Sequence, residues 1–311
     1  MTKSEARGSA LLSALFIMTL VAIVATGMSV RLQSDIVRTS LIIDTDRLMV
    51  ASDAVLFWAM DLLENRKERF SVAGSDGVVA QFPTRLSGLC PGITIEGRLI
   101  DLQARFNLNN LLDNKYRAIF WRLLTIQLPG VPANTRQTMA LALIDWQSLY
   151  DPERGLTALD NYYLSLSPPY QAAHQALHSI SELRLVSGVS QALMRTLSPE
   201  ISALAGTSLP ININTASAKM LQALGFKENA VNELLQKRGK TGISKLQTVE
   251  PLFRKNNIST ALITLQSAWF MSVAKVRLGD REVVRFVIYE RALDRKRGVT
   301  ARVVSAGFNT L

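Results

Sequence analysis

The feature that most constrains this chain is a run of 23 residues without a charged side chain, from Gly8 to Val30. A helix of about 20 apolar residues crosses the hydrocarbon core of a bilayer, so this run is long enough to span a membrane. Lys3 and Arg7 precede it, and positive charge tends to stay on the cytoplasmic side. We therefore expect a single-pass protein whose C-terminal domain lies on the far side of the membrane.

The helical pattern continues beyond the apolar run. Residues 29–72 contain neither Gly nor Pro, the two residues that most often end a helix. We predict one helix from Ser9 to about Glu68, roughly 90 Å long at about 1.5 Å per residue. Residues 9–70 are assigned to this element and residues 9–30 to its membrane part.

Two interpretations of the first residues stay open. An ordinary signal anchor is one, since a cleaved secretory signal has a shorter apolar region and a small-x-small site after it. The other is a prepilin leader, which EARG followed by SALLSALFIMTL resembles. That resemblance implies that residues 1–8 are a leader, cut between Gly8 and Ser9 by a prepilin peptidase, with methylation of the new N-terminus. The apolar helix is then kept.

Position 13 departs from most pilin-like proteins. They carry Glu at the fifth residue after the cut, where it pairs with the N-terminal amine of a neighbouring subunit. This chain has Ser13 there, and Ser9 stands where a large apolar residue is more common. A subunit without the acidic group suits the first position of a fibre, so we single out Ser13 as an assembly residue.

Composition limits the remaining possibilities. The 311 residues carry a formal net charge of +10 and one cysteine, Cys90, so no internal disulfide can form. Two histidines leave little material for a soft-metal site. His174 and His178, expected one helical turn apart, could bridge zinc, but no third ligand is near in sequence. RGKT at 238–241 lacks the earlier Gly of a phosphate loop, and no nucleophile elbow occurs, so we expect no enzyme.

Further along, strand patterns flank a helical block. Gly and Pro at 88–92 mark a turn before the alternating stretch 93–101, and Gly279-Asp280 joins two β-rich runs near the end. Between them we expect helices, including one at 167–177 and a short one at 179–186 capped by Ser181. The segments are a first part of the sheet (71–110), an inserted helical domain (111–209), a second helical unit (210–268) and C-terminal strands (269–311). The predicted fold class is α+β, pilin-like, with a long N-terminal transmembrane helix, a small β-sheet and a large all-helical insertion.

Three stretches, in this order, are similar to the K-type minor pseudopilins of type II secretion systems: IDLQARFNLNNLL (100–112), LHSISELRLVSGVS (177–190) and PININTASAKMLQAL (210–224). In that family the missing acidic residue at position 13 is usual. The resemblance implies a non-enzymatic subunit at the tip of a periplasmic pseudopilus, anchored in the bacterial inner membrane. Its implied partners are the I-type and J-type minor pseudopilins, the major pseudopilin and the inner-membrane secretion platform. Its implied role is to initiate the fibre and help export folded proteins.

The same resemblance implies a calcium site in the acidic loop at residues 142–163. Asp145, Asp151 and Asp160 match acidic positions of the family, and hard cations take several oxygens from such loops. Gln147 and Leu159 replace residues that are usually acidic. We therefore predict a calcium set of Asp145, Asp151, Glu153 and Asp160, with Asn161 as a further oxygen donor. The alternative is a loop whose Asp residues cap helices.

The segment 211–250 resembles a second class, the helix-hairpin-helix modules that bind DNA through backbone N–H groups aimed at a phosphate. The alternative function is thus a membrane-anchored DNA-uptake protein. Only Gly225 of the usual Gly pair is present, so we expect a structural role instead. In that role Asn212 and Asn214 satisfy local backbone groups, and Thr215 caps the following helix.

Overall fold

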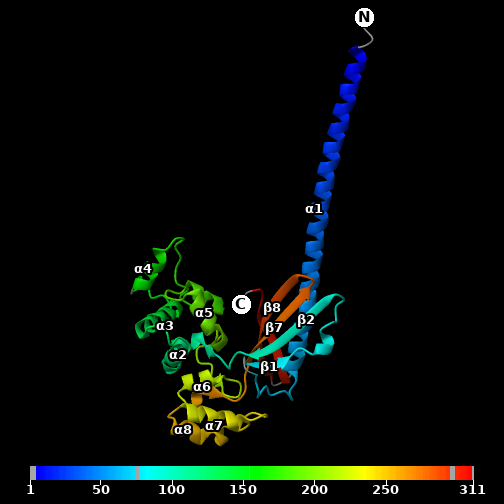
Figure 1. Ribbon diagram of the computed structural model, residues 1–311. Helices are drawn as coiled ribbons and strands as arrows, with labels where there is room; N and C mark the ends of the chain where they lie inside the picture. Colours follow the sequence, from blue (N-terminus) through cyan, green and yellow to red (C-terminus); the bar gives the residue numbers. More distant parts are fainter. Residues whose placement is uncertain (1–4, 75–76, 154, 295–297, 310–311) are drawn as a thin grey trace. The chain divides into compact units, whose positions relative to one another are not determined.

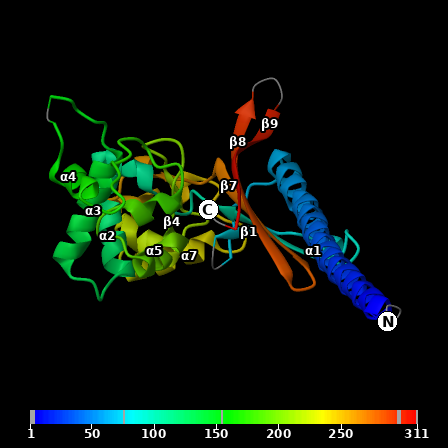
Figure 2. The same cartoon turned by 90° about the horizontal axis from the view of Figure 1, so that it is seen from above.

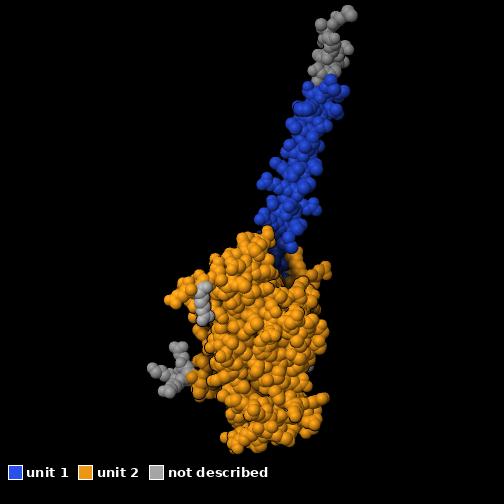
Figure 3. All heavy atoms as spheres, turned by 90° about the vertical axis from the view of Figure 1, so that its left-hand side faces the viewer, with its two compact units in different colours: residues 1–51 blue, residues 52–311 orange. Residues whose placement is uncertain are grey.

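The computed structural model describes residues 5–74, 77–153, 155–294 and 298–309, and it divides into two compact units, residues 1–51 and 52–311 (Figure 3). The first unit consists of the N-terminal part of helix α1 (Glu5–Glu64). From Ala10 onward α1 is long and apolar enough to cross a membrane, judged by length and composition. This agrees with the predicted membrane helix.

The helix ends four residues earlier than the predicted Glu68. The N–H group of Asn65 bonds the carbonyl of Leu62, and the Asn65 side chain accepts from the N–H of Lys67, which turns the chain away from helical geometry. Phe70 then adopts a positive φ of 47° and packs its ring against Phe270, with 5.0 Å between centroids. The segment around the end of this helix contains no Gly or Pro. The helix ends where the chain turns so that Phe70 can pack on the sheet.

Unit 52–311 contains a five-stranded antiparallel sheet with strand order β1-β2-β7-β8-β9 (Figure 1). The strands are β1 (Val78–Gln81), β2 (Ile93–Asp101), β7 (Trp269–Leu278), β8 (Arg281–Asp294) and β9 (Gly298–Phe308). The predicted strand at 93–101 and the turn at Gly279-Asp280 are confirmed. Since β2 and β7 are neighbours, with Asp101 opposite Phe270, residues 102–268 are an insertion within one sheet. The fold is α+β, as predicted.

The last turns of α1 pack on one face of this sheet. Val55, Ala59 and Leu63 recur at every fourth residue, share one side of the helix and are fully buried. Opposite Val55 the sheet has Gly97, where an added Cβ would lie 2.8 Å from both Val55 Cγ atoms and from Phe82 Cβ. A residue without a side chain at this point lets the helix approach the sheet closely.

The insertion lies on the side of β7 away from this part of α1, as Figures 1 and 2 both show. A single buried hydrophobic cluster runs through it from Phe106 to Ile263. The two segments that the sequence separates at residue 209 therefore share one core. The helices are α2 (Asn114–Gln127), α3 (Ala133–Gln147), α4 (Ala158–Leu164), α5 (Gln191–Leu197), α6 (Ala218–Leu224), α7 (Glu228–Arg238) and α8 (Glu250–Lys255). The short strands pair in parallel, β3 (Phe106–Asn107) with β4 (Ile201–Ser202) and β5 (Ile211–Asn212) with β6 (Ile263–Thr264).

One predicted helix is absent, and a second, short helix forms with a different cap residue from the predicted one. Residues 167–177 form no helix, because their backbone N–H groups serve other elements: that of His174 bonds the Trp146 carbonyl at 2.9 Å, and that of Leu177 bonds Asn109 Oδ1 at 2.8 Å. The segment at 179–186 is a short 3-10 helix, Ile180–Leu185, whose N-cap is Ser179 and not Ser181. His174 and His178 are consequently not one helical turn apart.

Candidate functional site

The first unit is a bare apolar helix. Its large hydrophobic side chains are mostly more than half exposed, for example Leu11 at 74%, Phe16 at 68% and Ile23 at 69%. Such a surface is stable only when lipid or other protein chains cover it. Ser13 lies on this exposed stretch. Gly8 and Ser9 belong to the helical backbone, and the surroundings of these two residues are not described, so the processing site stays a prediction.

A buried polar network holds the point where the insertion leaves and rejoins the sheet. Asp101, at the end of β2, has no exposed surface. Its Oδ2 accepts from Thr215 Oγ1 at 2.6 Å, Ser267 Oγ at 2.6 Å and Asn212 Nδ2 at 3.0 Å, and its Oδ1 accepts from the Gln103 N–H at 2.9 Å. Burial raises the pKa of Asp101 in spite of these four donors. Sequence reasoning missed this residue, although an acidic side chain closing a hydrophobic strand was a usable signal.

The Asn side chains of the FNLNN motif (106–110) form a second buried hydrogen-bond network. Asn107 accepts the Leu204 N–H and donates to the Gly206 carbonyl, while Asn109 donates to the Leu177 and Leu204 carbonyls. Asn110 donates to and accepts from the backbone of Leu209. All three are buried and bind backbone about 100 residues away along the chain. They fix the path of the segment that returns toward the sheet.

The ININT motif serves the same junction. Asn214 donates to the carbonyls of Ile243 and Leu265 and accepts the Ile243 N–H, so it ties two loops to β5. The prediction that Thr215 caps the next helix is wrong, because its hydroxyl is bonded to Asp101, and Ser217 caps α6 instead.

The hairpin after α6 faces the inside of the insertion. Gly225 has a φ of 120°, which favours Gly. The Arg122 guanidinium, from α2, donates to the carbonyls of Ala223 and Leu224 at 2.6 and 3.1 Å. In this position the hairpin holds α6 against α2 within the shared core, as a structural role requires.

The acidic loop divides into two parts. Asp145 and Asp160 both bond Thr157: its Oγ1 lies 3.3 Å from Asp145 Oδ2, and its N–H donates to Asp160 Oδ2 at 2.9 Å. Asp151 accepts the Glu153 N–H, which is a local turn. Throughout the described ranges no three His, Cys, Asp or Glu side chains gather as metal ligands would. The four predicted calcium residues are therefore not brought together. Only Asp145 and Asp160 lie near one another, at Thr157.

The carboxyl groups of this loop are nevertheless perturbed. Burial raises the pKa of Asp145. Burial also opposes ionisation of Asp160, but hydrogen bonds from Thr157 and the His174 ring, 3.2 Å away, outweigh it and hold the Asp160 pKa below its ordinary value. Asp160 and Thr157 form a capping box at the start of α4, which is the alternative that the sequence left open. Of the two replacements, Gln147 is buried and bonds backbone carbonyls, and Leu159 packs on the hydrophobic core.

Comparison with known proteins shows which family this chain resembles. Residues 104–206 match the family model described as type II secretion system (T2SS), protein K. The chain is 30% identical over 243 residues to a type II secretion system protein K of Pectobacterium carotovorum subsp. carotovorum, covering 71% of this chain and 72% of the relative. It is 32% identical over 260 residues to the protein K of Pseudomonas aeruginosa, covering 78% and 74%.

Among solved structures, the crystal structure of the GspK-GspI-GspJ complex of the enterotoxigenic Escherichia coli type 2 secretion system contains a chain with a similar fold. The TM-score is 0.68 at 23% identity, over 88% of this chain and 100% of that one. None of these relatives supports the DNA-uptake alternative. The chain belongs to the type II secretion system protein K family.

Proposed function

We propose that this chain is a minor pseudopilin that assembles with I-type and J-type subunits at the tip of a type II secretion pseudopilus. The observation that carries the proposal is a bare apolar helix joined to a fold shared with a K subunit solved together with I and J subunits. The chain acts as a structural subunit and not as an enzyme. The complex initiates the fibre, precedes the major pseudopilin and helps export folded proteins.

The architecture supports a terminal position. The insertion of residues 102–268 is attached at the ends of two inner strands of the sheet, β2 and β7, through the Asp101 junction. A fibre of packed helices has no room for a bulky insertion between successive subunits, whereas its tip has no such limit. Ser13 supplies no carboxylate for the N-terminal amine of a preceding subunit. Both features permit a first subunit and impede extension beyond it.

Placement in the membrane follows from charge. Lys3 and Arg7 before the apolar run favour a cytoplasmic N-terminus, an inner-membrane helix and a periplasmic domain. Contacts with the prepilin peptidase and the secretion platform take place at this helix. Intact mass of membrane-extracted protein, with and without the peptidase, tests the processing. Loss of residues 1–8 with one added methyl group on Ser9 is expected, and an intact Met1 in both samples would contradict it.

Partner choice is tested by co-expression of the full chain with I-type and J-type subunits, followed by purification through a tag on this chain. A ternary complex of this chain with the I-type and J-type subunits is expected. Ser13→Glu restores a carboxylate for the N-terminal amine of another subunit and should change the order of assembly, whereas Ser13→Ala, the matched control, should not. An unchanged order of assembly in Ser13→Glu would remove the argument from position 13.

Calcium binding remains a proposal. Asp145 and Asp160 provide two carboxylates near Thr157, so a site here needs backbone carbonyl or water oxygens in addition. Calorimetric titration of the full chain with Ca²⁺ should release heat and raise the melting temperature, and Asp145→Asn should abolish both effects. Titration without heat or thermal shift would leave these residues as helix caps.

A further inference from the structure

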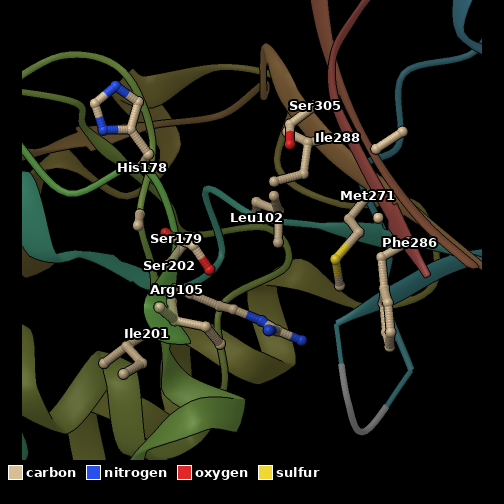
Figure 4. A pocket seen from close by; sticks show the side chains of 14 residues that line it. Leu102, Arg105, His178, Ser179, Ile201, Ser202, Met271, Phe286, Ile288 and Ser305 are labelled. Atoms are coloured by element: carbon tan, nitrogen blue, oxygen red, sulfur yellow. The ribbon is translucent and has the colours of Figure 1, made fainter. Parts of the chain in front are cut away.

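A cavity of about 160 Å³ lies between the sheet and the insertion (Figure 4). One wall comes from the sheet and includes Met271 of β7 and Phe286 and Ile288 of β8. The other wall comes from the insertion and includes Arg105, His178 and Ser202. Every lining residue belongs to unit 52–311. The hydrogen-bond network around Asp101 joins the insertion to the sheet, and the cavity opens next to this junction.

The deep part of the cavity is apolar but contains one unsatisfied polar atom. Leu102, Ile201 and Met271 are between 1% and 4% exposed. Ser202, next to Ile201 in β4, is 3% exposed, and its hydroxyl has no hydrogen-bond partner. A buried hydroxyl without a partner is costly, so this atom is a reason to expect a bound group. An apolar cavity of about 150 Å³ takes one benzene-sized molecule, which sets the scale of the ligand body.

The polar part of the lining favours an anion. The Arg105 guanidinium carries only hydrogen-bond donors. The hydroxyls of Ser179 and Ser305 and the His178 ring are further groups in the lining that can donate. Among the residues that the structure describes, no Asp or Glu lines the cavity, and Arg105 Nη1 also donates to the Ser198 carbonyl at 3.4 Å. The Glu182 carboxylate, near His178, already accepts the backbone N–H groups of His178 and Ser179. A guanidinium beside an apolar chamber matches a carboxylate with a hydrophobic body.

We propose that this cavity is a binding site for a small carboxylate that carries one aromatic or branched aliphatic group. The hydrophobic group packs against Met271 and Ile288, which are paired across β7 and β8 on the sheet wall, and the carboxylate meets Arg105 and the Ser202 hydroxyl on the insertion wall. The mouth is accessible, because His178, Ser305 and Ala306 are exposed. The same chemistry has two sources, a free acid or the C-terminal residue of another polypeptide. The site is independent of the assembly role proposed above.

The test uses the full chain in lipid nanodiscs, because detergent would compete for an apolar cavity. Ligand-observed NMR and calorimetry measure binding of phenylacetate and of its neutral analogue phenylacetamide. A second pair of probes is a tripeptide ending in Phe and the same tripeptide with a C-terminal amide. We expect phenylacetate to bind with a Kd of about 1 mM or tighter, the range that a ligand of this size reaches. The amide should bind at least about tenfold more weakly, since a charge-assisted bond is lost.

Two variants locate the binding. Ile288→Trp fills the cavity and should abolish binding, whereas Leu164→Trp, on the exposed part of α4, should leave it unchanged. Arg105→Gln should weaken carboxylate binding about tenfold. Arg98→Gln, at an exposed position of β2, should not weaken it. Matching circular dichroism and melting curves verify that each variant is folded.

The outcomes are distinct. Binding of both acids identifies a site that accepts a chain terminus, and binding of phenylacetate alone identifies a free-acid site. Equal affinity for acid and amide, or full binding by folded Ile288→Trp, would overturn the proposal. Neither result depends on whether the chain assembles with I-type and J-type subunits.

Discussion

Replacing Asp101 by Ala tests whether the buried network holds the insertion on the sheet. The carboxylate accepts four hydrogen bonds, from Gln103, Asn212, Thr215 and Ser267. Without it, the Asn212 amide keeps the Ser267 hydroxyl as a partner, and the Thr215 hydroxyl keeps a long contact of 3.5 Å to the Asn212 carbonyl. The Gln103 N–H and the Ser267 O–H lose their acceptor.

Each buried donor left without a partner costs about 1–3 kcal/mol, so the two lost acceptors amount to about 2–6 kcal/mol of unfolding free energy. For a unit of this size the melting temperature should fall by about 10 °C. Thermal unfolding of the full chain in nanodiscs, followed by tryptophan fluorescence, measures this. Limited proteolysis should also cut near residues 102–105 and 265–268 before other sites, because these are the connections of the insertion.

Asp113→Ala is the matched control. Its carboxylate also accepts two hydrogen bonds, from the Lys115 N–H and the Ser208 hydroxyl, but it does so at the protein surface, where water can replace it. A clearly smaller loss is expected. If Asp101→Ala proved no more destabilising than Asp113→Ala, and proteolysis were unaltered, the network would not be what joins the two bodies.

Three further predictions concern the same unit. Gly97→Ala should cost about 1–3 kcal/mol because the new Cβ would meet Val55 and Phe82 at 2.8 Å, whereas Gly88→Ala, with open space around it, should be neutral in urea unfolding. Arg291→Ala should cost about 2–3 kcal/mol, since its guanidinium donates to the carbonyls of Leu63, Asn65 and Glu68 at the end of α1; Arg98→Ala serves as the exposed control, and equal losses would contradict this. Because the folded state lowers the Asp160 pKa below 3.8, ionised Asp160 stabilises the protein above that pH, and this contribution is lost as the pH falls through the folded-state value. The difference in melting temperature between wild type and Asp160→Asn should therefore shrink as the pH falls below 3.8, and a difference that stays constant would refute the assignment.

Several elements follow from the sequence because their causes are local. The apolar run without Gly or Pro dictates α1, and alternation with a Gly-Asp turn dictates β2, β7 and β8. The order strand, helices, strand was enough to infer an insertion. Each of these features depends on neighbouring residues, whose pattern is visible along the chain.

Contacts between distant residues required the tertiary structure. Phe70 ends α1 by packing on Phe270, and the backbone of residues 167–177 bonds Trp146 and Asn109 instead of forming a helix. The calcium prediction shows the same limit, since spacing could not tell which of its four carboxylates meet.

The partners of Asp101 and the cavity at Ser202 likewise could not be read from the sequence, although the acidic residue at the end of a hydrophobic strand was visible there. Both arise where segments more than 90 residues apart come together, at Asp101 with Asn212 and Ser267 and at Arg105 with Ser198. The sequence by itself determined the long apolar helix, the sheet and the family of this protein, because periodicity and motifs are local. Only the tertiary structure decided how the insertion is held and what space it encloses, because burial and hydrogen-bond partners depend on which surfaces meet.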